Sequence, residues 1–111
     1  MRLDPFRLPQ VVSYATRDDS GEVTFTIDGR GVILRRTLSR SGLQATIALP
    51  ATAFMGVAAR AIEDAEGQVT VTLELMHNDP DLSVPLLVAE DLADVAADWR
   101  AWAAAYRLPL L

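Results

Sequence analysis

Residues 22–28 read EVTFTID, residues 28–31 read DGRG and residues 32–38 read VILRRTL. Apolar and polar residues alternate along the first segment, which is typical of a strand with one buried and one exposed face. The intervening DGRG favours a tight turn, because aspartate bonds its own backbone and glycine accepts a positive φ. The stretch 22–38 therefore predicts an antiparallel β-hairpin.

Similar segments extend this hairpin in both directions. Residues 11–14 predict a short strand before it, and residues 43–49 predict a further strand after it, which Pro50 ends. Residues 69–76 alternate valine and leucine with polar side chains, and residues 85–89 are a short apolar run. Each of these patterns indicates a strand.

Residues 54–63 fit two patterns. A helical face would contain Phe54, Val57, Ala58, Ala61 and Ile62, whereas a strand would place alternate residues of the same segment on one face. We prefer the strand, because residues 65–68 (AEGQ) have the length of a hairpin turn and contain a glycine.

The C-terminal segment predicts the one helix, beginning at Glu90 and ending near Arg107. Its apolar residues recur at spacings of three and four, which gives a single apolar stripe. They are Leu92, Val95, Trp99, Trp102 and Tyr106. Pro109 prevents the helix from continuing. Trp99 lies in the middle of the stripe, so we expect it to be largely buried against the sheet.

Together these elements predict an α+β fold. We expect an antiparallel sheet of five to six strands, arranged as a meander, with the C-terminal α-helix packed on one face. Residues 1–10 are expected to form an extended N-terminal arm, because Pro5 and Pro9 disfavour helix. Residues 11–111 are expected to form one domain, since a chain of 111 residues can bury a core without a metal or a disulfide.

The composition argues against several classes of function. Ten arginines and no lysine face fifteen acidic residues, for a net charge of −5. Because nucleic-acid binding favours a basic domain, we expect no nucleic-acid partner. No apolar run is long enough to span a membrane, and no signal peptide is present, so a cytoplasmic location is expected. Without cysteine and with one histidine, thiol chemistry and zinc sites are not expected, and we expect no cofactor.

The charge is distributed unevenly along the chain. Residues 1–60 contain eight arginines and five acids, whereas residues 61–111 contain two arginines and ten acids. Such polarity can steer a partner or favour association between copies.

The loop 77–85 collects residue types that occur in active and metal sites. A Ser-His-Asp hydrolase would need these types to converge from different elements, and no Gly-x-Ser-x-Gly elbow is present. A calcium site could use the oxygens of Asn78, Asp79 and Asp81, but a bidentate glutamate is missing. We expect instead that the side chains of His77 and its neighbours cap the backbone of their own loop, and we predict no catalytic residues.

Arginines gather around the strand 32–38 and the turn that follows it. Arg35 and Arg36 are adjacent, so they point to opposite faces of the sheet, and either one of them points toward the helix side or the strand lies at an edge. An inward arginine needs a carboxylate partner, for which Asp94 and Asp98 on the helix are candidates. Alternatively, these arginines and Arg40 hold an anion.

Two functions remain open from the sequence. The first is a non-enzymatic interaction or adaptor domain that acts as a homodimer or binds a protein partner, because no catalytic constellation is found and a meander leaves exposed strand edges. The second is a small anionic-ligand-binding domain with a pocket between the sheet and the C-terminal helix. Its candidate ligand-binding residues are Arg35, Arg36, Arg40, His77 and Trp99.

Several strings in the second half of the chain are distinctive. They are IALP (47–50), AFMGVA (53–58), MHNDPDLSVPL (76–86), DWRAW (98–102) and LPL (108–110). Together they resemble a small alphaproteobacterial family known only as a domain of unknown function, over about residues 28–111. The resemblance implies a bacterial, cytoplasmic protein and assigns no role to any residue.

Overall fold

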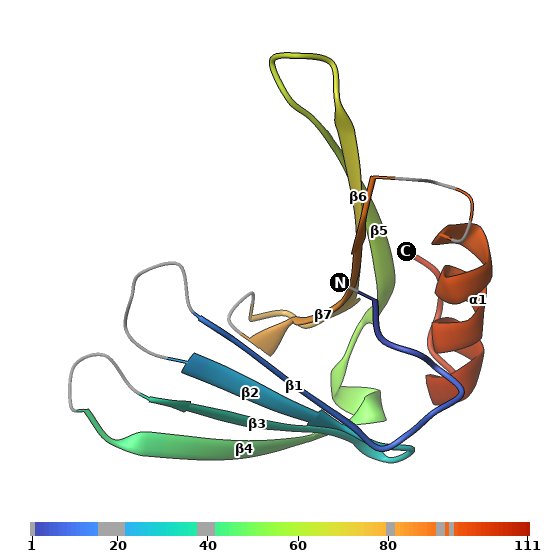
Figure 1. The fold of residues 1–111 in the computed structure, drawn as a ribbon. Coiled ribbons are helices and arrows are strands. Elements are labelled where there is room, and N and C mark those ends of the chain that lie inside the picture. Colours follow the sequence, from blue (N-terminus) through green and yellow to red (C-terminus); the bar gives the residue numbers. More distant parts are fainter. Residues whose placement is uncertain (1, 16–21, 38–41, 80–81, 91–92, 94) are drawn as a thin grey trace.

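The computed structural model describes residues 2–15, 22–37, 42–79, 82–90, 93 and 95–111. These residues form two antiparallel sheets and one α-helix (Figure 1). The α+β class, the antiparallel strands and the C-terminal helix are confirmed. The prediction of one sheet of five to six strands is wrong, because the strands divide into a sheet of four and a sheet of three.

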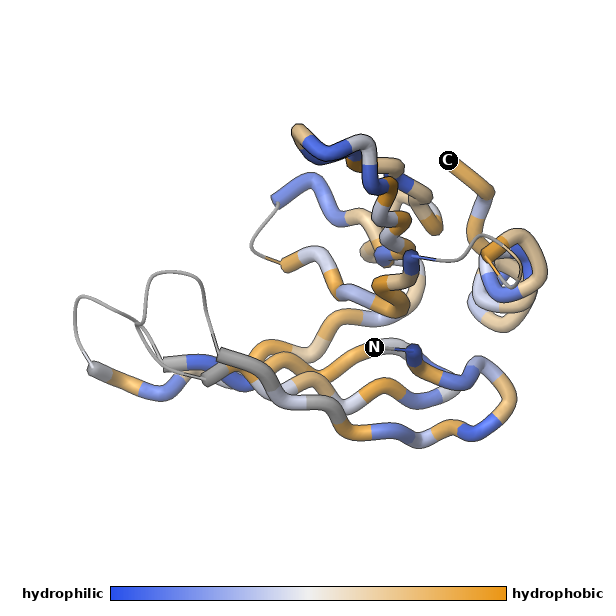
Figure 2. Tube along the Cα trace, turned by 45° about the horizontal axis from the view of Figure 1, so that its top comes forward, coloured by the Kyte–Doolittle hydropathy of each residue, from blue (hydrophilic) through white to orange (hydrophobic). Residues whose placement is uncertain are grey.

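The first sheet is a meander in the order β1-β2-β3-β4. Its strands are β1 (Gln10–Ala15), β2 (Glu22–Ile27), β3 (Gly31–Thr37) and β4 (Gln44–Pro50). Phe25 lies opposite Leu34, and Leu34 lies opposite Ile47, so alternate apolar residues line up on one face. Figure 2 shows this alternation as orange and paler steps along the strands. The buried residues of this inner face are Val23, Phe25, Ile27, Val32 and Leu34.

The chain leaves the first sheet at Pro50. A 3₁₀ turn, η1 (Ala51–Ala53), follows directly, and the Ala51 N–H donates a 3.0 Å hydrogen bond to the Arg30 carbonyl oxygen. This bond fixes the redirected chain against the β2–β3 turn. Phe54 is then buried, and the following strand starts a new sheet. The redirection at Pro50 is the physical reason why one continuous meander does not form.

The second sheet has the order β5-β6-β7. Its strands are β5 (Gly56–Glu63), β6 (Val69–Met76) and β7 (Val84–Ala89), so the strand interpretation of residues 54–63 is confirmed. The tip of the β5–β6 hairpin projects away from the body (Figure 1). The buried residues of this sheet include Val57, Val71, Leu73, Leu75, Val84, Leu86 and Leu87.

The N-terminal residues add to the edge of this second sheet. Arg2 forms an antiparallel bridge with Leu87 of β7, and the Leu3 N–H donates a 2.9 Å hydrogen bond to the Leu86 carbonyl oxygen. Leu3 is buried in the core. The first residues of the segment predicted as an arm therefore pair with β7.

The C-terminal residues add to the opposite edge. The Val57 N–H donates to the Pro109 carbonyl oxygen, and the Leu111 N–H donates to the Val57 carbonyl oxygen, both at 2.9 Å. The segment runs parallel to β5. Gly56 permits this approach, because a Cβ at that position would lie 2.6 Å from the Pro109 oxygen.

The helix α1 (Val95–Tyr106) packs against β5 and β6. It begins later than the predicted Glu90, and Ala93 lies in a turn before it. Trp102 is the fully buried tryptophan, whereas Trp99 packs against the core but is only partly buried, less than predicted. The buried face of α1 centres on Val95, Asp98, Trp102 and Tyr106. Trp99 lies at its flank and donates from Nε1 to the Val57 carbonyl oxygen at 2.6 Å.

Both sheets and the helix share one hydrophobic core. Trp102 stacks on Tyr106 with ring centroids 5.9 Å apart, and the indole fills the space between α1 and the sheets. Among the described residues, no helix has the length and apolar character needed to cross a membrane.

Candidate functional site

The edge strand β4 is the most unusual surface of the described fold. The two edges of the second sheet are each partly closed by a chain terminus, whereas β1 and β4 lie at the two outer edges of the first sheet. Natural edge strands commonly avoid pairing by means of charges, internal prolines or bulges. The β4 sequence, QATIALP, contains no charge, and its proline is the last residue. Its register with β3 is unbroken over seven pairs, so β4 is an unprotected edge.

The side chains of β4 continue both faces of the sheet. Ile47 and Leu49 are partly buried and pack against the core. Thr46 and Ala48 are exposed on the outer face, beside Ile33, whose exposed fraction is 40%. A strand added along β4 could therefore extend the apolar inner face as well as the backbone ladder.

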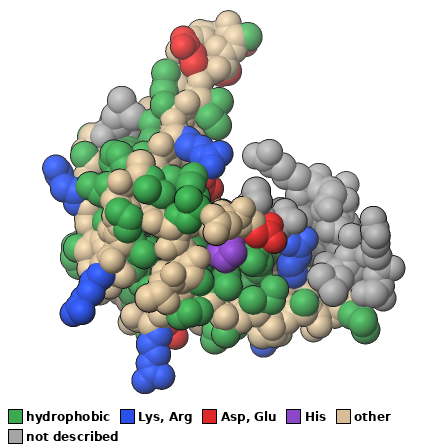
Figure 3. Space-filling model, turned by 180° about the vertical axis from the view of Figure 1, so that it is seen from behind, with side chains coloured by type: hydrophobic (Ala, Val, Ile, Leu, Met, Phe, Trp, Pro, Cys, Tyr) green, Lys and Arg blue, Asp and Glu red, His purple; other side chains and the backbone are tan. Residues whose placement is uncertain are grey.

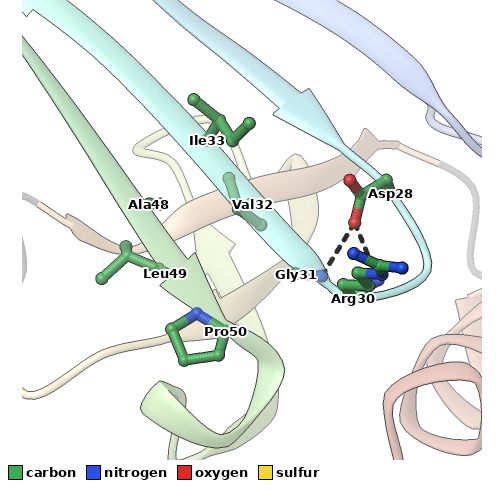
Figure 4. A pocket seen from close by; sticks show the side chains of 8 residues that line it. All are labelled: Asp28, Arg30, Gly31, Val32, Ile33, Ala48, Leu49 and Pro50. Carbon is green, nitrogen blue, oxygen red and sulfur yellow. Dashed lines mark hydrogen bonds between the residues drawn. The ribbon is translucent and has the colours of Figure 1, made fainter.

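A shallow hollow adjoins the end of β4 (Figure 4). Its volume is about 360 Å³, and its walls come from β3, β4 and the β2–β3 turn. The Asp28 carboxylate does not serve as a free group there, because its Oδ1 accepts the backbone N–H of Arg30 at 2.7 Å and that of Gly31 at 3.0 Å. The lining residues are Asp28, Arg30, Gly31, Val32, Ile33, Ala48, Leu49 and Pro50.

The ligand-binding residues predicted from the sequence come from different elements of the fold. Arg35 is exposed on the outer face of β3, and Arg36 lies on the inner face. His77 follows β6, and Trp99 lies on α1 against β5. Arg40 lies outside the described residues.

The loop after β6 uses its polar groups on its own backbone. The His77 Nδ1 accepts the Asp79 N–H at 2.9 Å, and the Ser83 Oγ accepts the His77 N–H at 3.0 Å. The imidazole ring meets Phe54 edge to face, with centroids 5.9 Å apart. These contacts are the backbone caps that the sequence predicts. Because His77 and Ser83 bond to backbone groups, they are not arranged as a nucleophile and its base.

The metal site considered from the sequence is not assembled by the described residues. Asn78 and Asp79 are exposed, and Asp81 lies outside the described part of the chain. Within that part, no three His, Asp or Glu side chains form a group able to hold a metal ion.

The buried carboxylate of α1 has a partner that the sequence analysis missed. Arg2 donates from Nε and Nη2 to both oxygens of Asp98, at 2.7 and 2.8 Å. The expectation that Asp98 pairs with Arg35 or Arg36 is therefore wrong, and Asp94 lies outside the described residues. The two residues are separated by 96 positions in the sequence. The one hint of the pair in the sequence was that Asp98 lies next to the apolar stripe of the helix, where a carboxylate needs a partner.

The comparison with known families covers the entire sequence. Residues 1–111 match a family of unknown function, DUF6101. The chain belongs to this family. No curated protein and no solved structure matches the chain. Membership of DUF6101 confirms the family resemblance of the quoted strings and extends it over the whole chain. Because the family is of unknown function, the role of this DUF6101 protein is argued from its own geometry.

Proposed function

We propose that this DUF6101 protein is a non-enzymatic interaction domain that works as a homodimer joined through β4. The observation that carries the proposal is the contrast between the edges. The termini partly close the edges of the second sheet, whereas β4 offers seven uncharged residues without a bulge, one more than β1 at the other edge of the first sheet.

A second copy of the chain is the partner that suits β4 best. Antiparallel pairing of β4 with β4 about its middle residue would place Ile47 opposite Ile47, and Ala45 opposite Leu49. A twofold interface repeats the same surface on both copies, so any charge on it would meet a like charge or lie close to one. The uncharged β4 avoids that penalty, although each chain carries a net charge of −5.

The inner faces also favour this pairing. Ile47 and Leu49 pack against the core of their own copy but are only partly buried. In the paired arrangement their exposed sides would meet the same residues of the second copy. Burial of apolar area contributes roughly 25 cal/mol per Å², so these contacts would add to the backbone hydrogen bonds.

The arrangement around His77 supports a non-enzymatic role. The ring nitrogen Nδ1 and the hydroxyl of Ser83 are both engaged with backbone N–H groups of the loop. The two side chains act here as caps of the loop that connects β6 and β7.

Light scattering coupled to gel filtration tests the proposal. We expect the parent protein at micromolar concentration to have the mass of two chains. Ala48→Lys places a charge on the exposed face of β4 and should give the mass of one chain, which still unfolds cooperatively and loses only the stability that association adds. Ala105→Lys is the matched control, because Ala105 is also exposed but lies on α1, and it should remain a dimer. A parent protein with the mass of a single chain at high micromolar concentration would overturn the proposal.

A further inference from the structure

Arg36 points toward the interior of the molecule. On β3 the residues Val32 and Leu34 are buried on the inner face, and Arg36 follows them at the same two-residue spacing. Arg35 lies on the opposite face and is exposed. The parity of the strand therefore places one guanidinium group on the core side of the sheet.

Arg36 is half-buried, and its guanidinium has one nitrogen without an acceptor in the described chain. Its Nε is buried without a hydrogen-bond acceptor, and no described carboxylate forms an ion pair with Arg36. Asp98 is paired with Arg2, and Glu74 lies 2.9 Å from Arg60 in an ion pair although its Oε1 accepts no hydrogen bond. An unpaired buried charge is costly, so an inward arginine without a carboxylate is the exception that needs an explanation.

The cross-strand neighbours of Arg36 offer it no polar partner. Its cross-strand partner on β4 is Ala45, whose side chain is a single methyl group. On β2, the inward residue at this end of the sheet is the apolar Val23. Figure 3 shows the histidine, an acidic and a basic side chain next to one another on the face seen from behind.

We infer that Arg36 anchors a binding site for a small carboxylate or phosphate anion on the inner face of the four-stranded sheet. Both anions present paired oxygen atoms that match the planar fork of a guanidinium group, and such charge-assisted bonds are among the strongest in proteins. A bound anion would supply the acceptor that Nε lacks. Arg36 lies on β3, one strand in from the β4 edge, and the inference does not require the proposed dimer.

The Nε–H resonance of Arg36 reports directly on this site in a ¹⁵N-edited NMR spectrum. The probes are inorganic phosphate and succinate, each titrated at constant ionic strength against sodium chloride. Comparison with Arg36→Leu assigns the resonance, and Arg35→Leu is the matched control on the outer face of the same strand. We expect a saturable shift of the Arg36 signal with at least one anion and none with chloride.

The two variants distinguish specific binding of the anion at Arg36 from a general effect of the anion on surface charge. In Arg35→Leu the affinity for the anion should stay within about twofold of the parent, whereas Arg36→Leu should weaken it by roughly tenfold or more, a loss of about 1.4 kcal/mol. Since leucine removes an unpaired charge, Arg36→Leu should also unfold at a midpoint equal to or above that of the parent. A response to phosphate alone indicates a phosphate compound, and one to succinate alone indicates a carboxylate. No saturable response to either anion, or an equal affinity in Arg36→Leu, would overturn the inference.

Discussion

The Tyr106 hydroxyl donates a 2.7 Å hydrogen bond to the carbonyl oxygen of Asp28. This bond joins the last turn of α1 to the turn between β2 and β3, across 78 positions of sequence. Because α1 packs on the second sheet, the contact ties together the two sheets and the helix. The Asp28 carboxylate accepts two backbone N–H groups of the β2–β3 turn, and the Asp28 carbonyl oxygen accepts the Tyr106 hydroxyl of the helix.

The same contact predicts a dependence of stability on alkaline pH. Burial, and then the nearby charge of Asp28, raise the pKa of Tyr106 above its ordinary value. The folded state therefore holds the phenolic proton more tightly than the unfolded chain does, in which the pKa is about 10. The resulting stability is complete below about pH 10 and is lost as the pH rises further. We expect the free energy of unfolding, measured with urea, to fall above this pH.

Tyr106→Phe separates this effect from other titrations. The variant should lose about 1 kcal/mol at pH 8, because the Asp28 carbonyl oxygen loses its donor. Its stability should then fall less steeply than that of the parent between pH 8 and about pH 11. Identical slopes for the two proteins would show that Tyr106 does not carry the effect.

Trp102 should contribute more to stability than any other residue of α1. Its side chain is fully buried, so Trp102→Ala should cost about 3–5 kcal/mol in urea unfolding. Trp102→Phe should cost much less, since it keeps an aromatic ring and removes an Nε1 group that is buried without an acceptor. Arg100→Ala, on the exposed side of the helix, should change the free energy by less than about 0.5 kcal/mol. A loss in Trp102→Ala no larger than in Arg100→Ala would contradict the described packing.

The Arg2–Asp98 pair should attach the N-terminal segment to α1. Arg2→Ala leaves a buried carboxylate without its donors, so we expect a loss of about 1–3 kcal/mol. The double variant Arg2→Ala/Asp98→Asn should recover part of that loss, because the neutral amide is less costly to bury. Arg7→Ala is the control: Arg7 pairs with Asp4 at 3.5 Å on the surface, where such pairs contribute about 0–1 kcal/mol. Equal effects of Arg2→Ala and Arg7→Ala would show that the buried pair has no special role.

Gly56→Ala should release the C-terminal segment from β5. A methyl group there would collide with the Pro109 oxygen and with the Leu111 side chain, both 2.6 Å away. We expect the amides of Val57 and Leu111 to exchange with deuterium faster in the variant. In a chain that lacks residues 109–111, the same substitution should leave the unfolding midpoint unchanged. If Gly56→Ala also lowered the unfolding midpoint of the shortened chain by a large amount, the added methyl group would collide with a part of the protein other than residues 109–111.

The strands were predictable because their signals are local. Alternation between residues 22 and 38 and the turn at 28–31 specify a hairpin without reference to the rest of the chain. The division into two sheets depends on where the chain goes after Pro50, and on both termini adding to the second sheet. Such pairings between distant segments leave no local pattern in the sequence.

The candidate sites were predictable only in part. The adjacency of Arg35 and Arg36 indicated that they lie on opposite faces of the strand. The sequence did not show that Asp98, a candidate partner, pairs with Arg2 instead. Residues 43–49 were recognisable as an uncharged strand, but strand order was needed to place β4 at an edge. Trp99 lies against β5 as predicted but is only partly buried, because the exact orientation of a short helix depends on its packing partner.

A cysteine scan along β4 tests the proposed dimer most directly. The chain contains no cysteine, so each single variant at positions 45, 46, 47 and 48 carries one thiol. Residues that face each other across an antiparallel pair have Cβ atoms about 4.5–5.5 Å apart, close enough for a disulfide after a small adjustment. On mild oxidation, Ile47→Cys should form linked dimers fastest, since position 47 would face itself across the twofold axis. Ala105→Cys, on the exposed side of α1, should stay unlinked. Equal, slow linking at 47 and 105 would contradict the β4 interface.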